Sequence, residues 1–592
     1  MYANSAVIQK AIEAKLYEKR YWKLLLHIPS DVSEIDDARF FFAPSGASDA
    51  KAELVATLEA FYDDSRLDDE AALCKFPARG AWLKERLDLQ DLPNVNCQEY
   101  ESLKKRVDPV SVTMVFPSAH INSPASMFGH TFLRINSSYN SRLLSYAINY
   151  AADADPKKEN GVMFAIKGLF GGYYGKYSLL PYYEKLKEYR DTENRDIWEY
   201  DLDLTSQEVE RMFAHIWELK DTQSYYYFFT ENCSYNMLWL LEVAREELHL
   251  REYFGYQVIP LETVFPLQEE GIITQKHYRP SKRSNLVWFE KVIENENLEK
   301  PHKLIESSLD VESFLEDSSL DVAQKRVVLE AAIELLEYSF KSNELSKEEH
   351  LELFHKLTTA RATLGVSKMQ NDILPHNPLE GHRAMRTTLT QGEREGHGLT
   401  QLGFRFAYHD TEESHVGFLR GTGIEFGDLL VSRTAEKTYL EKATIISIDS
   451  YTQNSPYVKG FSWRTKIGWD RKYLNEKTNF SFNVGVGYSV GNDLGYIYAM
   501  ADPYLLYTSK ALGGVGASVG AVLDRYKSLH IATQYTQRHF SDSSKQHLYN
   551  LSAGYRVSSN IFVKMAYENI KQYESDKDLK RETLQAGVNF YF

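Results

Sequence analysis

The sequence lacks several features that would place it in common classes of protein. It has no apolar run of about 18 residues and its mean hydropathy is −0.44, which excludes an ordinary transmembrane helix. A formal charge of −15 and a pI near 5.7 argue against a nucleic-acid partner, because such proteins carry a basic stripe. C-x-x-C, H-E-x-x-H and P-loop motifs are missing, so we predict no metal ion, nucleotide or other cofactor.

Cysteine is scarce, with three residues in a chain of 592. Cys74 and Cys97 flank one short helical segment and could form a disulfide, which would require an oxidising compartment. The alternative is that all three cysteines are reduced and inert. If the first two are paired, Cys233 is the odd thiol of an exported protein.

The N-terminus lacks a basic segment followed by an apolar one. It begins in a predicted amphipathic helix, with Ile8, Ile12 and Leu16 at helical spacing. Either the protein is cytoplasmic, or a signal peptide has been removed and a start Met put in its place.

Aromatic residues are abundant: 40 Tyr, 30 Phe and 8 Trp make up 13% of the chain. The length suggests about three or four domains. Shifts in composition and periodicity predict four: a helical domain (1–105), a mixed domain of strands and helices (106–280), a second helical domain (281–375) and an all-β domain (383–592). A polar linker is expected near 372–382.

The all-β region contains about twelve segments of alternating polarity, of about ten residues each. NFSFNVGVGYSV (479–490), for example, places Phe480 and Val484 on one side and Ser481 and Asn483 on the other. A soluble β-sandwich also alternates, but its strands are shorter. Aromatic residues near segment ends, and Phe592 at the end of the sequence, favour an antiparallel outer-membrane β-barrel of about twelve strands.

An even number of strands brings both ends of a barrel to the periplasmic side. Residues 1–375 are therefore expected in the periplasm, and the protein in the outer membrane. VSSN (557–560) and DRYKS (524–528) are predicted as short periplasmic turns, and 538–546 and 570–582 as longer external loops.

The strongest indication of chemistry is a His and a Cys in the mixed domain. His130 follows Gly129 at the edge of a predicted strand (129–135), and Cys233 begins an apolar helix with Asn232 as a plausible N-cap. A thiol at a helix N-terminus has a lowered pKa, and an imidazole nearby would complete a nucleophilic pair. The alternative is a buried structural Cys and an unrelated His.

Four motifs in this domain resemble the Lnb N-terminal periplasmic domain of bacterial lipoprotein N-acyltransferases. They are HINSPASMFGHTFLRI (120–135), INYA (148–151), NRDIWEYDLDLTSQE (194–208) and TENCSYN (230–236). The order of His before Cys is similar to that of circularly permuted, NlpC-type papain-like enzymes. The resemblance covers about residues 106–250 and implies an α+β papain-like domain.

The resemblance also implies roles for individual residues. Cys233 would be the nucleophile and His130 its general base, with Asn149 or His120 as the third, orienting residue. The substrate site would be shaped by further residues: Ser126, Asn232, His120 and Tyr150.

Three functions remain open from the sequence. The first is an outer-membrane-anchored cysteine acyltransferase or lipid hydrolase, which acts through an acyl-thioester on a phospholipid or lipoprotein. The second is a peptidase or amidase on cell-wall peptides, and the third is a barrel channel or assembly factor without enzymatic activity. The expected partners are outer-membrane lipids and a lipoprotein or cell-wall peptide, and the sequence leaves the oligomeric state open.

Overall fold

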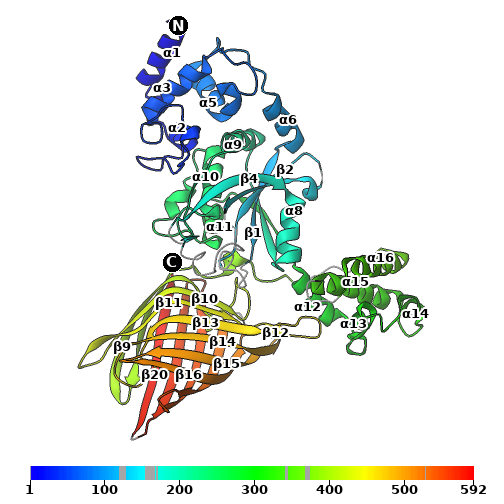
Figure 1. Cartoon of the computed structure of the whole chain (residues 1–592), viewed down its shortest axis with the longest axis vertical. Helices are drawn as coiled ribbons and strands as arrows, with labels where there is room; N and C mark the ends of the chain where they lie inside the picture. The colour runs from blue at the N-terminus through cyan, green and yellow to red at the C-terminus, as the bar shows by residue number, and fades with distance from the viewer. Residues whose placement is uncertain are drawn as a thin grey trace. The chain divides into compact units, whose positions relative to one another are not determined.

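The computed structural model of the chain describes residues 2–118, 128–139, 141–153, 167–168, 171–340, 345–366, 374–526, 528–575 and 577–592. The chain forms two compact units, Met1–Arg279 and Pro280–Phe592 (Figure 1). None of the described helices is both long and apolar enough to cross a membrane.

The first unit begins with helices that enclose a buried ion pair. Arg79 Nη1 lies 2.7 Å from Glu53 Oε1, and neither side chain is exposed. The same carboxylate accepts the backbone N–H groups of Phe42 and Ala43 at 3.0 and 2.8 Å, so both of its oxygens are satisfied. The helices are α1 (Tyr2–Glu13), α2 (Arg20–Leu25), α3 (Ala50–Phe61), α4 (Ala72–Lys75), α5 (Pro77–Leu87) and α6 (Gln98–Val107).

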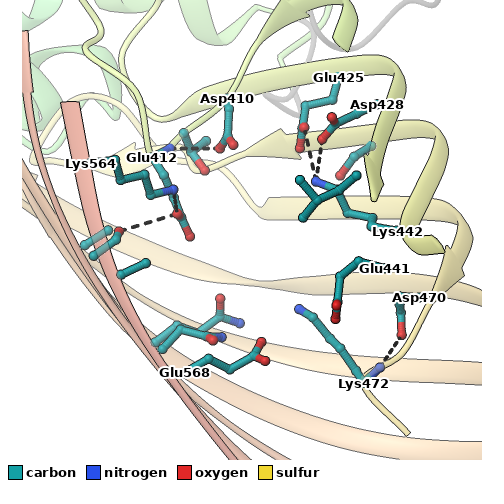
Figure 2. Close-up of a pocket in the computed structure, with 18 of the residues that line it drawn as sticks. Asp410, Glu412, Glu425, Asp428, Glu441, Lys442, Asp470, Lys472, Lys564 and Glu568 are labelled. Atoms are coloured by element: carbon teal, nitrogen blue, oxygen red, sulfur yellow. Dashed lines mark hydrogen bonds and ion pairs between the residues drawn. The ribbon is translucent and has the colours of Figure 1, made fainter. Parts of the chain in front are cut away.

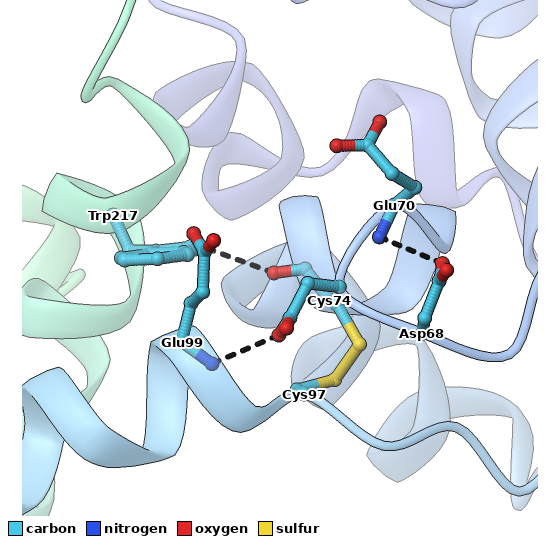
Figure 3. The surroundings of a disulfide bond; sticks show 7 residues. Asp68, Glu70, Cys74, Cys97, Glu99 and Trp217 are labelled. Carbon is cyan, nitrogen blue, oxygen red and sulfur yellow. Dashed lines mark hydrogen bonds between the residues drawn. A yellow bond between two sulfur atoms is a disulfide. The ribbon is translucent and has the colours of Figure 1, made fainter.

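A disulfide joins α4 to the start of α6 (Figure 3). Cys74 and Cys97 are 23 residues apart in the sequence, and their Cα atoms are 5.1 Å apart. Trp217 Nε1 donates to the carbonyl oxygen of Cys74 at 2.8 Å, which ties the disulfide to helix α9 (Ser206–Glu218). Of the two alternatives that the sequence leaves open, the structure has the disulfide.

A seven-stranded sheet follows, in which all pairs are antiparallel and the order is β6-β4-β3-β2-β1-β5-β7. The predicted strand at 129–135 begins later, at Phe132, so His130 lies just before it. The Tyr-rich segment 171–183 contains a strand, β4. The strands are β1 (Ser111–Pro117), β2 (Phe132–Asn136), β3 (Tyr146–Ala152), β4 (Tyr173–Pro181), β5 (Ile197–Leu202), β6 (Ser224–Tyr226) and β7 (Ile273–Arg279).

Helices cover both faces of this sheet (Figure 1). On one face Phe132 and Val115 pack against Tyr182 of α8 (Tyr182–Leu186) and Tyr189 of the π-helical turn η5 (Lys187–Thr192). On the other lie α9 and α10 (Cys233–Ala244), which contact β1, β2 and β3. Helix α9 starts with a capping box formed by Thr205 and Glu208. The sheet thereby presents β2 and β3 to the start of α10. A short helix, α11 (Val264–Glu269), precedes β7.

The second unit opens with five helices that share one apolar core. Glu290 of α12 accepts the hydroxyl of Ser455 at 2.7 Å and the backbone N–H of Tyr457 at 2.6 Å. The Tyr457 hydroxyl donates to the carbonyl oxygen of Leu298 at 2.8 Å, so a barrel loop is part of this core. The helices are α12 (Lys282–Val292), α13 (Lys300–Ile305), α14 (Val311–Glu316), α15 (Val322–Ser339) and α16 (Lys347–Thr363).

The barrel consists of twelve antiparallel strands, as predicted, and closes through the β20–β8 and β14–β15 pairs. Apolar side chains such as Val486 and Tyr488 are exposed on the outside, and polar ones such as Ser489 are buried. A two-residue strand, β12 (Gln453–Asn454), pairs in parallel with β14. The twelve strands are β8 (Arg386–Arg394), β9 (His397–His409), β10 (Thr422–Arg433), β11 (Thr438–Ser450), β13 (Ser462–Asp470), β14 (Asn479–Asn492), β15 (Gly495–Tyr507), β16 (Ala511–Leu523), β17 (Leu529–Phe540), β18 (Lys545–Ser558), β19 (Ile561–Tyr573) and β20 (Asp578–Tyr591).

Two of the four predicted connections are confirmed as short turns, since β16 ends at Leu523 and β17 begins at Leu529, and β18 ends at Ser558 and β19 begins at Ile561. The prediction of the two longer loops is wrong. Segments 538–546 and 570–582 are mostly strand, because the ladder continues to the pairs His539–Lys545 and Tyr573–Asp578. The long connections are 410–421 and 451–461, at the end where the chain enters and leaves the barrel. We call this the near end; there the backbone N–H of Phe592 donates to Met385 at 3.1 Å. The opposite end is the far end.

Candidate functional site

Cys233 is the first residue of α10, and Asn232 determines where this helix starts. The Asn232 Oδ1 atom accepts the backbone N–H groups of Ser234 and Tyr235, the second and third residues of the helix, at 3.0 and 3.2 Å. This is the contact of a helix N-cap. Its Nδ2 atom donates to the carbonyl oxygens of Phe228 and Val258 at 2.9 and 2.6 Å. All four contacts of the side chain are with backbone groups, so Asn232 positions the start of the helix that carries Cys233.

His130 lies between Asn149 and the Cys233 thiol. Its Nε2 atom is 2.8 Å from Asn149 Oδ1, and its side chain also hydrogen-bonds to the thiol. With Nε2–H donated to Asn149, the other ring nitrogen, Nδ1, is left for the sulfur. The preceding residue must be glycine, because Gly129 has a φ of +89° and a Cβ there would lie 2.6 Å from the Phe116 ring.

The surroundings of Cys233 favour its thiolate. Burial raises the pKa of the thiol, but the charge and hydrogen bond of His130 outweigh this effect, together with hydrogen bonds from Ser234 and the backbone of Thr131. The result is a pKa lowered from 9.0 to about 7. The position at the start of α10 acts in the same direction, because a helix N-terminus stabilises negative charge. Near neutral pH a substantial fraction of Cys233 is therefore nucleophilic.

Tyr226, on the edge strand β6, is a site residue that the sequence analysis missed. It makes hydrogen bonds with both the backbone and the thiol of Cys233. Burial first, and then the charge of Cys233, raise the pKa of Tyr226 well above its ordinary value, so the phenol stays a donor. Tyr150 stacks on Tyr226 with ring centroids 6.0 Å apart, and it is itself almost fully buried. The Tyr226 phenol and the Cys233 N–H therefore lie together beside the thiol, where donors could act on a reacting group.

Aromatic rings surround this group. Phe128 meets Phe228 and Phe229 edge-on, with ring centroids 5.6 and 6.0 Å apart. The Tyr189 ring centroid lies 5.7 Å from that of His130. The thiol therefore lies in a largely apolar setting, in which electrostatic effects on a reacting group are strong.

The structure thus brings together Cys233, His130 and Asn149, with Asn232 and Tyr150 beside them. The other two predicted residues, His120 and Ser126, lie outside the described residues. Asn149 and His120 were alternative candidates for the orienting residue, and Asn149 is the one seen in contact with His130.

A second polar cluster lies at the near end of the barrel and does not fit a metal ion. His382, His409 and Glu413 have ligand atoms within 4.8 Å of one another. However, Arg386 donates to Glu413 at 2.7 Å and Arg405 donates to both of its oxygens at 3.0 Å. A cation would have to compete with two guanidinium groups for this carboxylate, so the cluster is an ion-pair network.

A closed barrel of twelve strands with an apolar exterior and a charged interior is the architecture of outer-membrane proteins. The protein is therefore an outer-membrane β-barrel with a periplasmic-type N-terminal domain. Residues 99–269 match the family model of the Lnb N-terminal periplasmic domain, which confirms the resemblance seen in the sequence.

Three further family models match, each described as a domain of unknown function. They cover residues 14–86 (DUF7843), 276–373 (DUF7842) and 375–591 (DUF7840). None of the curated proteins matches the chain.

Solved structures of outer-membrane proteins are similar to about a third of the chain. The COG4313 outer membrane channel from Pseudomonas putida F1 is 10% identical, with 38% of this chain and 100% of that chain covered and a TM-score of 0.24. Omp33 of Acinetobacter baumannii is 9% identical over 36% and 100% of the two chains, with a TM-score of 0.21. The anion-selective porin from Comamonas acidovorans is 8% identical over 35% and 98%, with a TM-score of 0.20.

Proposed function

We propose that the periplasmic domain is a thiol acyltransferase or lipid hydrolase that is held at the outer membrane by its barrel. The observation that carries this proposal is the contact of His130 with both Cys233 and Asn149, with the pKa of the thiol at about 7. This is the relation of nucleophile, base and orienting group on which covalent catalysis depends.

In the first half of the proposed reaction, the Cys233 thiolate attacks the carbonyl carbon of a phospholipid ester, after its proton has passed to His130. The oxyanion that forms is stabilised by the Cys233 N–H and the Tyr226 hydroxyl. The C–O bond to glycerol then breaks, and His130 returns the proton to the leaving alcohol. The products are a lysophospholipid and an acyl-thioester on Cys233.

In the second half, an amine or water attacks the thioester carbonyl. His130 takes the proton of the attacking group, the C–S bond breaks, and Cys233 leaves as a thiolate. An amine such as a lipoprotein N-terminus gives an amide, and water gives a free fatty acid. The partly exposed phenyl rings of Phe228 and Phe229 support an acyl substrate over a cell-wall peptide, because they offer apolar surface rather than hydrogen-bond partners.

The test is to trap the thioester. The full chain is reconstituted in vesicles that contain phospholipid with a labelled acyl chain, denatured rapidly, and treated with hydroxylamine, which cleaves thioesters. We expect protein-bound label that hydroxylamine releases, and none in Cys233→Ala. The matched control is Cys74→Ala/Cys97→Ala, which keeps Cys233 as its single cysteine and should keep the label.

A lipopeptide with a free α-amine is then added. Transfer of label to the lipopeptide identifies a transferase, and release of fatty acid alone identifies a hydrolase. The proposal is contradicted if the wild type forms neither thioester nor lysophospholipid, or if Cys233→Ala forms both as readily.

A further inference from the structure

The lumen of the barrel is crossed at its far end by the loop 471–478, which joins β13 to β14. Arg581 of β20 donates to the carbonyl oxygen of Arg471 at 2.7 Å. Gln546 of β18 donates to the carbonyl oxygen of Lys472 at 3.0 Å. Because β18 and β20 lie several strands away from β13 around the barrel, these contacts fold the loop inward across the mouth.

The loop 410–421 crosses the near end in the same manner. Its Glu412 pairs with Lys564 of β19, and its Arg420 pairs with Asp524 between β16 and β17. Between the two loops lies a cavity of about 410 Å³ lined by charged side chains (Figure 2). The lumen is therefore a chamber between two inward-folded loops.

Most of the cations that line the chamber have a carboxylate partner. Toward the far end, Arg394 lies 2.8 Å from Glu441, and Arg581 lies 3.1 Å from Glu568. Four cations of the lining are different: within the part of the chain that the structure describes, no carboxylate forms an ion pair with Lys466, Arg471, Lys472 or Arg538. Arg471 donates instead to the carbonyl oxygen of Glu476 and lies over the Tyr439 ring, which leaves Lys466, Lys472 and Arg538.

Lys466, Lys472 and Arg538 all line this cavity. The charges of Lys466 and Arg538 act on Lys472 and are opposed by those of Glu568 and Asp470. Desolvation in the lumen, followed by the charge of Lys466, lowers the pKa of Lys472 to about 8. Asp470 accepts the backbone N–H of Lys472 at 2.9 Å and the hydroxyl of Ser481 at 3.0 Å, and its single negative charge is shared by the three cations. Figure 2 shows the Lys472 side chain extending into the lumen.

Arg538 supplies an unused donor. Its guanidinium lies 4.1 Å from the centroid of the Tyr504 ring, which orients it. Its Nε atom is buried and, among the described residues, has no hydrogen-bond partner. A buried donor without a partner is costly, and an anion in the chamber would satisfy it.

We propose that Lys466, Lys472 and Arg538 form a binding site for an oxyanion of the phosphate class inside the barrel. Two ammonium groups and a guanidinium provide the charge and the donors that a tetrahedral dianion needs. A ligand with one carboxylate group would neutralise only part of this positive charge. The group bound is either free inorganic phosphate or the phosphate of a small glycerol phosphate, and these two sources share the same chemistry.

The test measures binding of radiolabelled inorganic phosphate to the full chain in detergent at neutral pH, by equilibrium dialysis. We expect one saturable site, weakened by about tenfold or more in Lys472→Gln and in Arg538→Gln, since each removes a cation next to the anion. The matched control is Lys477→Gln, which makes the same charge change on an exposed lysine of the same loop and should bind as the wild type does.

Competition with glycerol 3-phosphate separates the two sources: tighter binding than phosphate identifies the ester, and weaker binding identifies the free ion. Folding of each variant is checked by the heat-dependent migration of the barrel on gels. Lys472 lies in a loop rather than a strand, so Lys472→Gln keeps the test available if Arg538→Gln does not fold. Absence of saturable binding of both ligands to the wild type, or equal binding by Lys472→Gln, would overturn the proposal.

Discussion

In the first unit the buried Arg79 and Arg134 each lie against a buried carboxylate, at 2.7 and 2.8 Å, whereas in the barrel Lys466, Lys472 and Arg538 face a cavity. The difference follows from how each unit excludes water. A sheet covered on both faces by helices leaves charges no solvent, so each needs a partner. A barrel interior retains space for water or a ligand, so its charges can remain unpaired.

The same difference separates the two candidate sites. The Cys233 site is assembled from specific backbone and side-chain contacts, as the four hydrogen bonds of Asn232 illustrate. The proposed site in the barrel chamber instead consists of cationic side chains that form no ion pair with a carboxylate of the described residues. A reactive thiol needs fixed geometry, and an anion can be held by charge that surrounds it loosely.

The largest expected effect is on the buried ion pair of the first unit. Arg79→Met leaves Glu53 as an uncompensated buried charge and should destabilise this unit by about 3–5 kcal/mol. Lys466→Gln in the lumen breaks no ion pair and should cost less than about 1 kcal/mol. Thermal unfolding of the full chain, followed by circular dichroism of the helices, compares the two variants. Similar losses of stability would remove the contrast between the units.

The disulfide is expected to rank second. Cys74→Ala/Cys97→Ala opens a loop of 23 residues, which should cost about 3 kcal/mol through the added entropy of the unfolded chain. The cost should appear in the helical transition of the first unit and not in the melting of the barrel. A shift in barrel melting of similar size would show that the two units do not unfold independently.

A smaller effect is expected for the N-cap of α10. Asn232→Ala removes the cap and the two contacts with the carbonyl oxygens of Phe228 and Val258, and should cost about 1–2 kcal/mol. Asn232→Ser keeps an oxygen that can cap the helix and loses only the two Nδ2 contacts, so it should cost less. Denaturant midpoints of the helical transition measure both variants, and a larger loss in the Ser variant would contradict the assignment of the cap.

The smallest effect concerns pH. His27 and His215 meet at 3.0 Å between their Nε2 atoms, and burial, followed by the charge of His215, lowers the pKa of His27 well below 6.5. Below pH 6.5 the unfolded chain takes up a proton that the folded His27 does not, so stability falls as the pH falls. The loss between pH 7.5 and 5.5 should be about 1 kcal/mol. His27→Gln should flatten this dependence, and an unchanged slope would contradict it.

Much of the fold could be predicted because the barrel strands carry a local signal. Alternation across residues 479–490 is visible in the sequence, and β14 covers these residues. The lengths of the far-end loops could not be predicted, since polar residues such as Lys545 and Asp578 are held in the ladder by cross-strand pairing. A run of polar residues indicates a loop only where no neighbouring strand forms hydrogen bonds with it.

The site was predictable only where it depends on neighbours in the sequence. Asn232 caps the helix that starts at Cys233, and both could be seen in one motif. Tyr226 reaches Cys233 because β6 pairs with β4, and a three-residue edge strand has no sequence pattern of its own. His27 and His215 are 188 residues apart, so only the folded chain brings them together.

The most direct test of the central claim is the pKa of Cys233 itself. The rate of alkylation of the full chain, with the disulfide intact, is measured against pH for the wild type and for His130→Gln. We expect a midpoint near pH 7 in the wild type and a shift to 9 or above in the variant, in which burial is no longer opposed by the imidazole. A wild-type midpoint near 9, or the same midpoint in both proteins, would contradict the claim.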